Sequence, residues 1–269
     1  MEERDFDYVR GVVREHAAIV VDKGKEYLVE SRLGPLAREL KFASIGELTE
    51  KLRGGDLSLR ARVIEAMTTN ETSFFRDRSP FDAMRDVIVP ELLKAREAER
   101  SLHIWCGASS TGQEPYTLAM LLLDSFPMLS EWKFSILATD LSEEVLAKAK
   151  SGLFTQLEVN RGLPANYLAR YFAKEDTSWR LQSSVRDRVS FRQMNLASAW
   201  PTLPKADVVF MRNVLIYFDV QVKKQILGGV HKLLRPDGFM FLGAAETTLG
   251  VTDQFVRKTM GKSVCYRPK

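Results

Sequence analysis

The clearest chemical signal in the sequence is the segment Trp105–Tyr116, which reads WCGASSTGQEPY. Its glycines and small residues stand between an apolar run and a helical pattern, where a ligand can approach the backbone closely. Gly107 and Gly112 have the spacing of a phosphate loop, but Gln113 and Glu114 occupy positions where that motif requires Lys and Ser or Thr. A carboxylate here would repel a pyrophosphate and suit a cationic ligand. The alternative is a tight strand-to-helix turn with a solvated glutamate.

A second carboxylate, Asp140, comes directly after the next apolar run, Phe134–Thr139. An acid at the carboxyl end of a parallel strand can accept both hydroxyl hydrogens of a ribose. Asp140 could instead cap the helix expected over 142–150, but Ser142 is the better-placed cap. S-adenosylmethionine has a ribose, a sulfonium and an ammonium and carries no phosphate. Glu114 and Asp140 together are therefore consistent with this cofactor.

Two further predicted strand ends carry polar residues. Asn195 lies in QMNL, and Arg212 and Asn213 begin RNVLIYF. Each residue alone would more often form a turn or a loop hydrogen bond. Because open α/β sheets bind ligands outside the carboxyl ends of their strands, these residues and Asp140 are predicted to share one crevice.

Composition supports a folded chain and narrows its partners. The 269 residues are 45% hydrophobic and 28% charged, with a net charge of +4, which is too small to indicate nucleic acid by itself and is compatible with an acidic protein partner. The apolar runs are shorter than the roughly 20 residues of a membrane helix, and MEERDFDYVR contains no signal core, so a cytoplasmic location is expected. Cys106, Cys265 and the three histidines show no ligand spacing, so no metal is expected.

The elements that position these residues follow from hydrophobic periodicity. Residues 1–70 are predicted to form a small helical domain, because apolar residues recur at helical spacing and Gly54-Gly55 provides a break. Residues 71–100 are predicted to be a linker and a connecting helix, with Ser79, Pro80 and Asp82 as its N-cap, first and third residues. The apolar positions are Phe6, Val9, Val12, Val13, Tyr27, Leu28, Leu33, Leu36, Leu40, Val63, Ile64 and Met67.

From residue 101 to 269, short apolar strands alternate with helices, which predicts an α/β fold with a doubly wound, mostly parallel sheet. Arg235–Gly238, reading RPDG, is expected to be a turn. Trp179–Gln182 and Arg188–Arg192 look too short for main-sheet strands and predict a small antiparallel β-subdomain at about 172–192. The expected strands are 102–106, 134–139, 207–211, 239–244 and 263–266, and the expected helices are 113–126, 142–150 and 220–234.

Four motifs in order resemble those of the CheR family, the chemotaxis receptor methyltransferases: NETSFFR at Asn70–Arg76, STGQEPY at Ser110–Tyr116, ATD at Ala138–Asp140 and RNVLIYF at Arg212–Phe218. The resemblance covers nearly the whole chain. Ser31-Arg32-Leu33, with Leu36 and Arg38, is similar to the family's N-terminal helical domain, and Lys232–Gly238 is similar to its later turn. One difference is Gly107, which replaces an alanine common in the family and is expected to loosen the loop.

The resemblance implies a class I methyltransferase-like domain with a helical N-terminal domain and a small β-subdomain, and S-adenosylmethionine as the cofactor. The implied activity is methyl transfer to glutamate side chains of cytoplasmic chemoreceptor domains, giving methyl esters. Matched motif by motif, the cofactor-binding residues are Asn70, Thr72, Arg76, Glu114, Asp140, Asn195, Leu196, Arg212 and Asn213. Arg76 and Tyr217 are the candidate catalytic residues.

Several alternatives stay open in the sequence. Arg76 could pair with the cofactor carboxylate or with the acceptor glutamate, and Tyr217 could face the acceptor or fill the core. Six basic residues of the helical domain could contact acidic receptor helices or be solvated: Arg32, Arg38, Lys41, Arg53, Arg60 and Arg62. A methyltransferase acting on RNA or a small molecule is the alternative enzyme, and a cofactor-binding sensor without turnover is a third class.

One partner prediction rests on the segment Lys174–Arg188. Members of the family that tether to a receptor's C-terminal peptide have a longer, glycine-containing β-subdomain whose edge pairs with that peptide. This segment has no glycine and looks several residues shorter. The chain is therefore predicted to methylate receptors that lack a tethering peptide.

Overall fold

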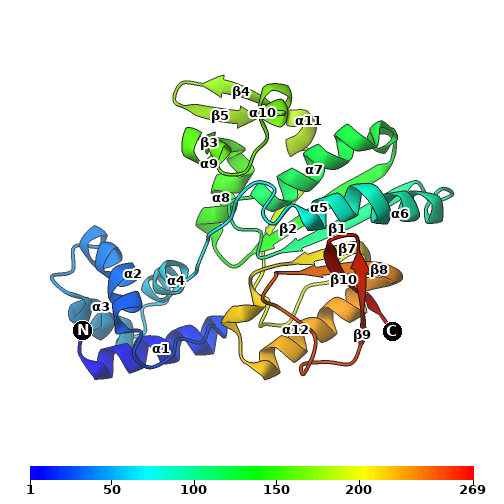
Figure 1. The fold of residues 1–269 in the computed structure, drawn as a ribbon. Coiled ribbons are helices and arrows are strands. Elements are labelled where there is room, and N and C mark those ends of the chain that lie inside the picture. The colour runs from blue at the N-terminus through cyan, green and yellow to red at the C-terminus, as the bar shows by residue number, and fades with distance from the viewer. The chain divides into compact units, whose positions relative to one another are not determined.

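The computed structural model describes residues 1–269, which form two units. The first unit comprises Met1–Thr69 and Tyr217–Lys223, and the second comprises Asn70–Ile216 and Lys224–Lys269. Figure 1 shows the helical N-terminal segment in blue and the strands of the second unit in green to red. None of the helices combines the length and the apolar character that crossing a membrane would require.

The first unit is helical, as the apolar spacing predicted, and it contains α1 (Glu3–Ala17), α2 (Glu26–Glu39), α3 (Ile45–Arg53) and α4 (Leu57–Ala66). Gly54-Gly55 separates the last two, and Gly55 has φ of +83°. Side chains define both starts, because the Ser44 hydroxyl accepts from the Glu47 N–H and the Asp56 carboxylate accepts from the Leu59 N–H. Most predicted apolar positions are buried, but Tyr27 is 68% exposed and lies outside the core.

The second unit is built on a seven-stranded sheet of order β6-β2-β1-β7-β8-β10-β9. The strands are β1 (Ser101–Gly107), β2 (Lys133–Asp140), β6 (Val189–Gln193), β7 (Ala206–Met211), β8 (Leu234–Leu242), β9 (Phe255–Met260) and β10 (Ser263–Pro268). The first five strands in this order are parallel, and β10 pairs antiparallel with β8 and β9. This arrangement confirms the predicted mostly parallel sheet.

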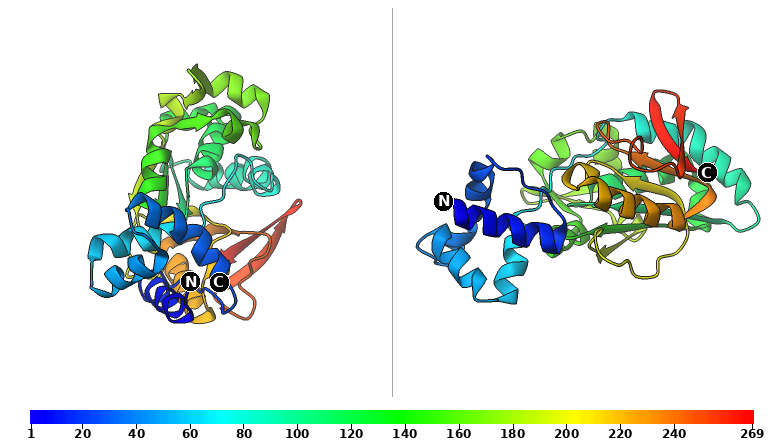
Figure 2. Two further views of the ribbon diagram at one scale, coloured as in Figure 1. Left: turned by 90° about the vertical axis from the view of Figure 1, so that its left-hand side faces the viewer. Right: turned by 90° about the horizontal axis from the view of Figure 1, so that it is seen from below.

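Helices cover both faces of this sheet, as Figures 1 and 2 show. On one face, α5 (Ser79–Ala83), the π-helical turn η1 (Met84–Ile88), α6 (Val89–Ala95) and α7 (Gln113–Ser125) pack against buried side chains of β1, β7 and β8. On the other face lies α12 (Val220–Leu233). Successive side chains of a strand point to opposite faces of the sheet, so β1 packs against both helix layers. Ile104 points to the first face and Trp105 to the second, and both are buried.

Two sequence expectations at element boundaries are wrong. Ser79 is the first residue of α5 and caps nothing, because the residue before the helix is Arg78, at φ of 28°, and no side chain makes a cap hydrogen bond. Arg235–Gly238 is no turn between elements but part of β8, where it bulges opposite Asp207, since Ala206 pairs with Leu234 and Val208 with Phe239.

The small antiparallel sheet exists, with the order β3-β5-β4. It is formed by β3 (Leu153–Thr155), β4 (Phe172–Glu175) and β5 (Ser178–Leu181). The segment 188–192 does not belong to it, because β6 pairs with β2 as a parallel edge strand of the main sheet. The remaining elements are η2 (Pro127–Glu131), α8 (Glu143–Ser151), α9 (Gln156–Asn160), α10 (Ala165–Tyr171), α11 (Ser183–Arg186) and η3 (Leu215–Tyr217).

Candidate active site

The loop after β1 is fastened to the end of β2 by Asp140. One carboxylate oxygen accepts from the Ser110 N–H at 2.8 Å, and the other accepts from the Ser142 N–H at 3.1 Å. Ser142 caps α8 as predicted, with its hydroxyl accepting from the Val145 N–H. Asp140 is 7% exposed, so these bonds are largely shielded from water. They fix the position of the carboxylate beside the loop.

Both glycines of this loop lie in close contact with other residues, but only Gly112 also has a positive φ. Gly112 has φ of +92° just before α7, and an added Cβ would lie 3.1 Å from the Cβ of Ala149. At Gly107, an added Cβ would lie 2.5 Å from Cε of Met211, which ends β7. Gly107 therefore leaves room for the Met211 side chain.

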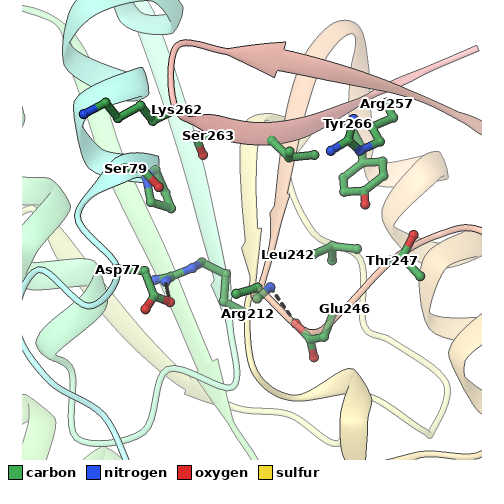
Figure 3. A pocket seen from close by; sticks show the side chains of 14 residues that line it. Asp77, Ser79, Arg212, Leu242, Glu246, Thr247, Arg257, Lys262, Ser263 and Tyr266 are labelled. Atoms are coloured by element: carbon green, nitrogen blue, oxygen red, sulfur yellow. Dashed lines mark hydrogen bonds and ion pairs between the residues drawn. The ribbon is translucent and has the colours of Figure 1, made fainter.

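Arg212, directly after β7, joins the first turn of α7 to the segment before α5. Its side chain is 2% exposed and donates to Glu114 at 2.7 Å, to Asp77 at 2.7 Å and to the carbonyl of Arg76 at 3.0 Å. Figure 3 shows Arg212 beside Asp77. Arg212 belongs to the fourth of the predicted motifs, Glu114 to the second and Arg76 to the first. These hydrogen bonds therefore connect three of the four motifs.

Glu114 is almost enclosed, with 13% of its side chain exposed. Burial raises the pKa of its carboxyl group, while Arg212, by its charge and hydrogen bond, and Arg76, by its charge, act in the opposite direction. The side chain of Arg76 is half-buried and donates to the Glu71 carbonyl at 3.1 Å. The structure therefore brings Arg76, Glu114 and Arg212 together.

The segment before α5 also reaches the loop after β1. The Ser110 hydroxyl donates to the carbonyl of Asn70 at 2.8 Å, and the Phe75 N–H donates to the Thr117 hydroxyl of α7. Thr72 lies between these two anchors and is half-buried. Asn70 and Thr72 are thus held near the carboxyl end of β1.

Asn195 and Leu196 follow β6 and lie next to the end of β2. The Met194 N–H donates to the Asp140 carbonyl at 2.9 Å, which ties this turn to β2. The Asn195 side chain accepts from the Ala197 N–H at 2.9 Å, while Leu196 is 6% exposed. These two predicted residues therefore lie on the Asp140 side of the site.

Glu246 is a residue that sequence reasoning missed. Its carboxylate accepts from five backbone N–H groups, those of Gly243, Asn213, Val214, Leu215 and Ile216, at 2.6 to 3.3 Å. Asn213 has φ of 58°, and this carboxylate holds it there. In the sequence, Glu246 stands out only as an acidic residue soon after an apolar run, and many surface glutamates have the same sequence context.

Tyr217 belongs to the first unit. Its carbonyl accepts from the Val20 N–H at 2.9 Å, and its side chain is half-buried. The role of its hydroxyl toward an acceptor stays a prediction.

Backbone strain gathers at the same edge of the sheet. Ten residues other than glycine have positive φ, and six of them lie in the segments just described: Phe75, Asp77, Arg78, Ala108, Ser110 and Asn213. Such conformations cost about 1–3 kcal/mol each and persist where the surroundings enforce them, commonly at ligand sites.

Two buried polar atoms at this edge lack a hydrogen-bond partner, namely Oγ of Ser109 and Nε of Arg212. A buried donor without a partner costs about 1–3 kcal/mol, which a polar ligand can recover. The donors and acceptors therefore fit a ligand with both polar and charged groups, such as S-adenosylmethionine. No group of three or more His, Cys, Asp or Glu side chains converges as metal ligands would.

Comparison with known proteins agrees with this geometry. Residues 70–264 match the family described as CheR methyltransferase, SAM binding domain, and residues 4–68 match CheR methyltransferase, all-alpha domain. The chain is 41% identical to chemotaxis protein methyltransferase 1 of Pseudomonas aeruginosa, over 98% of each chain. It is 39% identical to chemotaxis protein methyltransferase Cher2 of Pseudomonas putida, again over 98% of each, and 36% identical to a chemotaxis protein methyltransferase of Vibrio parahaemolyticus, over 100% of this chain and 97% of that one.

Proposed function

Because the chain belongs to the CheR family of chemotaxis methyltransferases and its cofactor is S-adenosylmethionine, we propose that it methylates glutamate side chains in the cytoplasmic domains of chemoreceptors. The products are a glutamate methyl ester and S-adenosylhomocysteine. The observation that carries the proposal is the Arg212 cluster, which joins Glu114 in the first turn of α7 to the Asn70–Arg76 motif.

In this proposal the carboxylates of the site bind the cofactor's polar groups. Glu114 faces the ammonium, and Asp140 accepts from the ribose hydroxyls. Asn70, Thr72 and Arg76 reach the cofactor from the segment before α5. The remaining contacts come from the ends of β6 and β7, through Asn195, Leu196, Arg212 and Asn213.

The chemistry needs no general base. A glutamate side chain has a reference pKa near 4.3, so its carboxylate is ionised at neutral pH and is itself the nucleophile. The bound cofactor supplies the methyl group on a positively charged sulfur. The residues of the site have to hold one carboxylate oxygen in line with that methyl group and exclude water. We place Arg76 at the cofactor side of the site and Tyr217 toward the acceptor.

Three of the six basic residues considered for receptor contact have partners within the first unit. Arg53 pairs with Asp5 and Glu50, and Arg62 pairs with Glu39. Arg32 donates to the carbonyls of Ala66, the last residue of α4, and Thr68, and to the Thr69 hydroxyl. The other three, Arg38, Lys41 and Arg60, form no ion pair and are the better candidates for contacting an acidic receptor helix.

The small antiparallel sheet supports recognition without a tethering peptide. Its outer strand β4 has four residues, and the turn to β5 contains only Asp176 and Thr177. A peptide added to such a short edge would gain few backbone hydrogen bonds. Titration of receptor C-terminal peptides should therefore give no measurable affinity, and micromolar binding of any of them would refute this part of the proposal.

The central experiment is transfer of tritium from methyl-labelled S-adenosylmethionine into membranes that contain chemoreceptors. We expect label in the receptor band and its release as methanol in base, since methyl esters are base-labile. A receptor with glutamine at every methylated position is the matched control and should stay unlabelled. Label in added RNA or in small acids, with none in receptors, would replace this function by the alternative methyltransferase.

A further inference from the structure

A second pocket lies at the carboxyl ends of β7 and β8, with a volume of about 400 Å³. Its walls come from the segment before α5, from the end of β8 and from the β9–β10 hairpin, as Figure 3 shows. Arg212 lines this pocket as well as contacting Glu114. The pocket therefore adjoins the predicted cofactor site and shares Arg212 with it.

The acidic groups of the pocket are already satisfied by the protein. Asp77 pairs with Arg212, and Glu246 accepts from five backbone N–H groups. An additional cation would find neither carboxylate free.

The basic groups are not satisfied in the same way. Arg257 and Lys262 are exposed, and neither forms an ion pair or a side-chain hydrogen bond within the protein. The hydroxyls of Ser79 and Tyr266, which also line the pocket, form no hydrogen bond either. Nε of Arg212, on a side chain 2% exposed, also lacks a partner. In Figure 3, Arg257 lies beside Tyr266 at one end of the pocket, and Lys262 extends above Ser79 at the other. The pocket thus offers charged and neutral donors to an anion.

The hairpin fixes the direction of Arg257. Arg257 pairs with Tyr266 across β9 and β10, so both side chains lie on the same face, and both line the pocket. The next residue, Lys258, pairs with Cys265 and faces the opposite side. Arg257 and Lys258 therefore carry the same charge on the same exposed strand, but only one of them faces the pocket.

We propose that this pocket is an anion subsite that binds a carboxylate side chain of the acceptor protein close to the glutamate that is methylated. The inference rests on the proposed function. Its occupant is a neighbouring carboxylate and not the reacting one, because pairing with a guanidinium lowers the basicity of a carboxylate and so weakens it as a nucleophile. The subsite would favour glutamates in acidic surroundings and hold the acceptor beside Arg212.

The test compares the double variant Arg257→Gln/Lys262→Gln with Lys258→Gln. The substrate is a purified cytoplasmic fragment of a chemoreceptor from the same genome. For the double variant we expect KM for this fragment to rise about tenfold, which corresponds to about 1.4 kcal/mol. Its kcat should stay within about twofold and its affinity for S-adenosylhomocysteine should be unchanged, since neither residue belongs to the cofactor site. Lys258→Gln should have the KM, the kcat and the affinity for S-adenosylhomocysteine of the unmodified protein. Both variants should unfold at the temperature of the unmodified protein.

Two further measurements identify the ligand class. Added glutarate should compete with the receptor fragment for the unmodified protein and lose this effect in the double variant. An unchanged KM in the double variant, an equal rise in Lys258→Gln, or stronger competition by an RNA oligonucleotide than by glutarate would overturn the carboxylate subsite.

Failure of the proposed function has a different signature. If the unmodified protein methylates no receptor fragment, calorimetry with the fragment and S-adenosylhomocysteine-bound protein still measures acceptor binding. Binding weakened only in the double variant would support the subsite. Equal binding by all three proteins, or no binding by any, would overturn it.

Discussion

β7 has a buried arginine–carboxylate cluster at each end, and the two clusters differ in how the central arginine is bonded and in what surrounds it. At its start, Asp207 accepts from Arg96 at 2.8 Å, and Arg96 also donates two hydrogen bonds to Asp237. At its end, Arg212 donates to Glu114 and to Asp77. Arg96 uses each of its three side-chain nitrogens, whereas Nε of Arg212 is buried and unpaired.

We infer that the Arg96 cluster stabilises the fold and that the Arg212 cluster is arranged to bind a ligand. The other oxygen of Asp207 accepts from the His103 N–H, which fixes the start of β7 to β1. The Arg212 cluster instead adjoins strained backbone at Asp77, Arg78 and Asn213 and a pocket with unpaired cations. Nε of Arg235, 3.4 Å from Asp207, is also buried without a hydrogen bond, so the clusters are distinguished by the strained backbone and the pocket beside Arg212, which are typical of a binding site.

The largest effect that tests this comparison is on stability at the first cluster. Arg96→Met should lower the free energy of unfolding by about 3–5 kcal/mol, because the buried Asp207 keeps only the 3.4 Å ion pair with Arg235 and Asp237 loses both of its hydrogen bonds from Arg96. Affinity for S-adenosylhomocysteine should not change in the molecules that fold. Urea unfolding and calorimetry provide the two measurements, and Arg100→Met, which breaks an exposed pair with Glu131, is the control that should alter neither. A weakened affinity in Arg96→Met would contradict the separation.

The second effect should appear as activity. Arg212→Met should lower kcat/KM for receptor methylation about 100-fold, or about 2.7 kcal/mol, because Glu114 loses its cation and Asp77 its anchor. Its stability should fall less than that of Arg96→Met, since Asp77 is 46% exposed and can turn to water, and Glu114, whose pKa is raised by burial, can take up a proton. Tritium-transfer rates, corrected for the folded fraction from urea unfolding, measure this. A stability loss as large as that of Arg96→Met, with the corrected rate unchanged, would make the two clusters equivalent.

The sequence predicts the positions of those site residues that depend on local sequence pattern. Glu114, Asp140 and Arg212 each follow a strand or open a helix, and the carboxyl ends of parallel strands meet at one edge. Their proximity therefore follows once the strands are recognised. The pairing of Arg96 with Asp207 lies outside local pattern, because the two are 111 residues apart in the sequence. The same holds for Glu246, whose partners are backbone groups of another loop.

The missed strands are edge strands. β6 and β9 lie at the two edges of the main sheet, so much of each strand is exposed and its sequence is mixed. Val189–Gln193 alternates polar and apolar residues, which suggested a separate small sheet, and VRKTM of β9 suggested no strand at all. Arg235–Gly238 has the composition of a turn but is retained in β8 as a bulge. The composition of a segment indicates how exposed it is, but it does not indicate which strand it pairs with.

A third, smaller effect tests whether Asp140 belongs with the ligand-binding cluster. Asp140→Ala should weaken binding of S-adenosylmethionine by about 1.5–3 kcal/mol, since the ribose loses a charged acceptor and Ser110 loses its anchor. Ser142→Ala is the matched control, because it removes the neighbouring helix cap and should cost about 1 kcal/mol of stability without changing affinity. Calorimetry measures both. Equal affinities of Asp140→Ala and the unmodified protein would remove the ribose assignment.

The smallest effect is a difference in pH dependence between the two clusters. Arg96 holds the pKa of Asp237 below its ordinary value of 3.8, so that group contributes stability above pH 3.8 that is lost as the pH falls toward the lowered pKa. Burial raises the pKa of Glu114 above its ordinary value of 4.5, so the sign is reversed, and ionised Glu114 costs stability as the pH rises from 4.5 through the raised pKa.

The cofactor's ammonium should favour ionised Glu114. Affinity for S-adenosylhomocysteine should therefore fall as the pH drops through that raised pKa, by at most about tenfold per pH unit. Glu114→Gln should bind weakly with a flat profile from pH 5 to 8, and Asp237→Asn should keep the unmodified slope. A slope that survives in Glu114→Gln would show that another group takes up the proton.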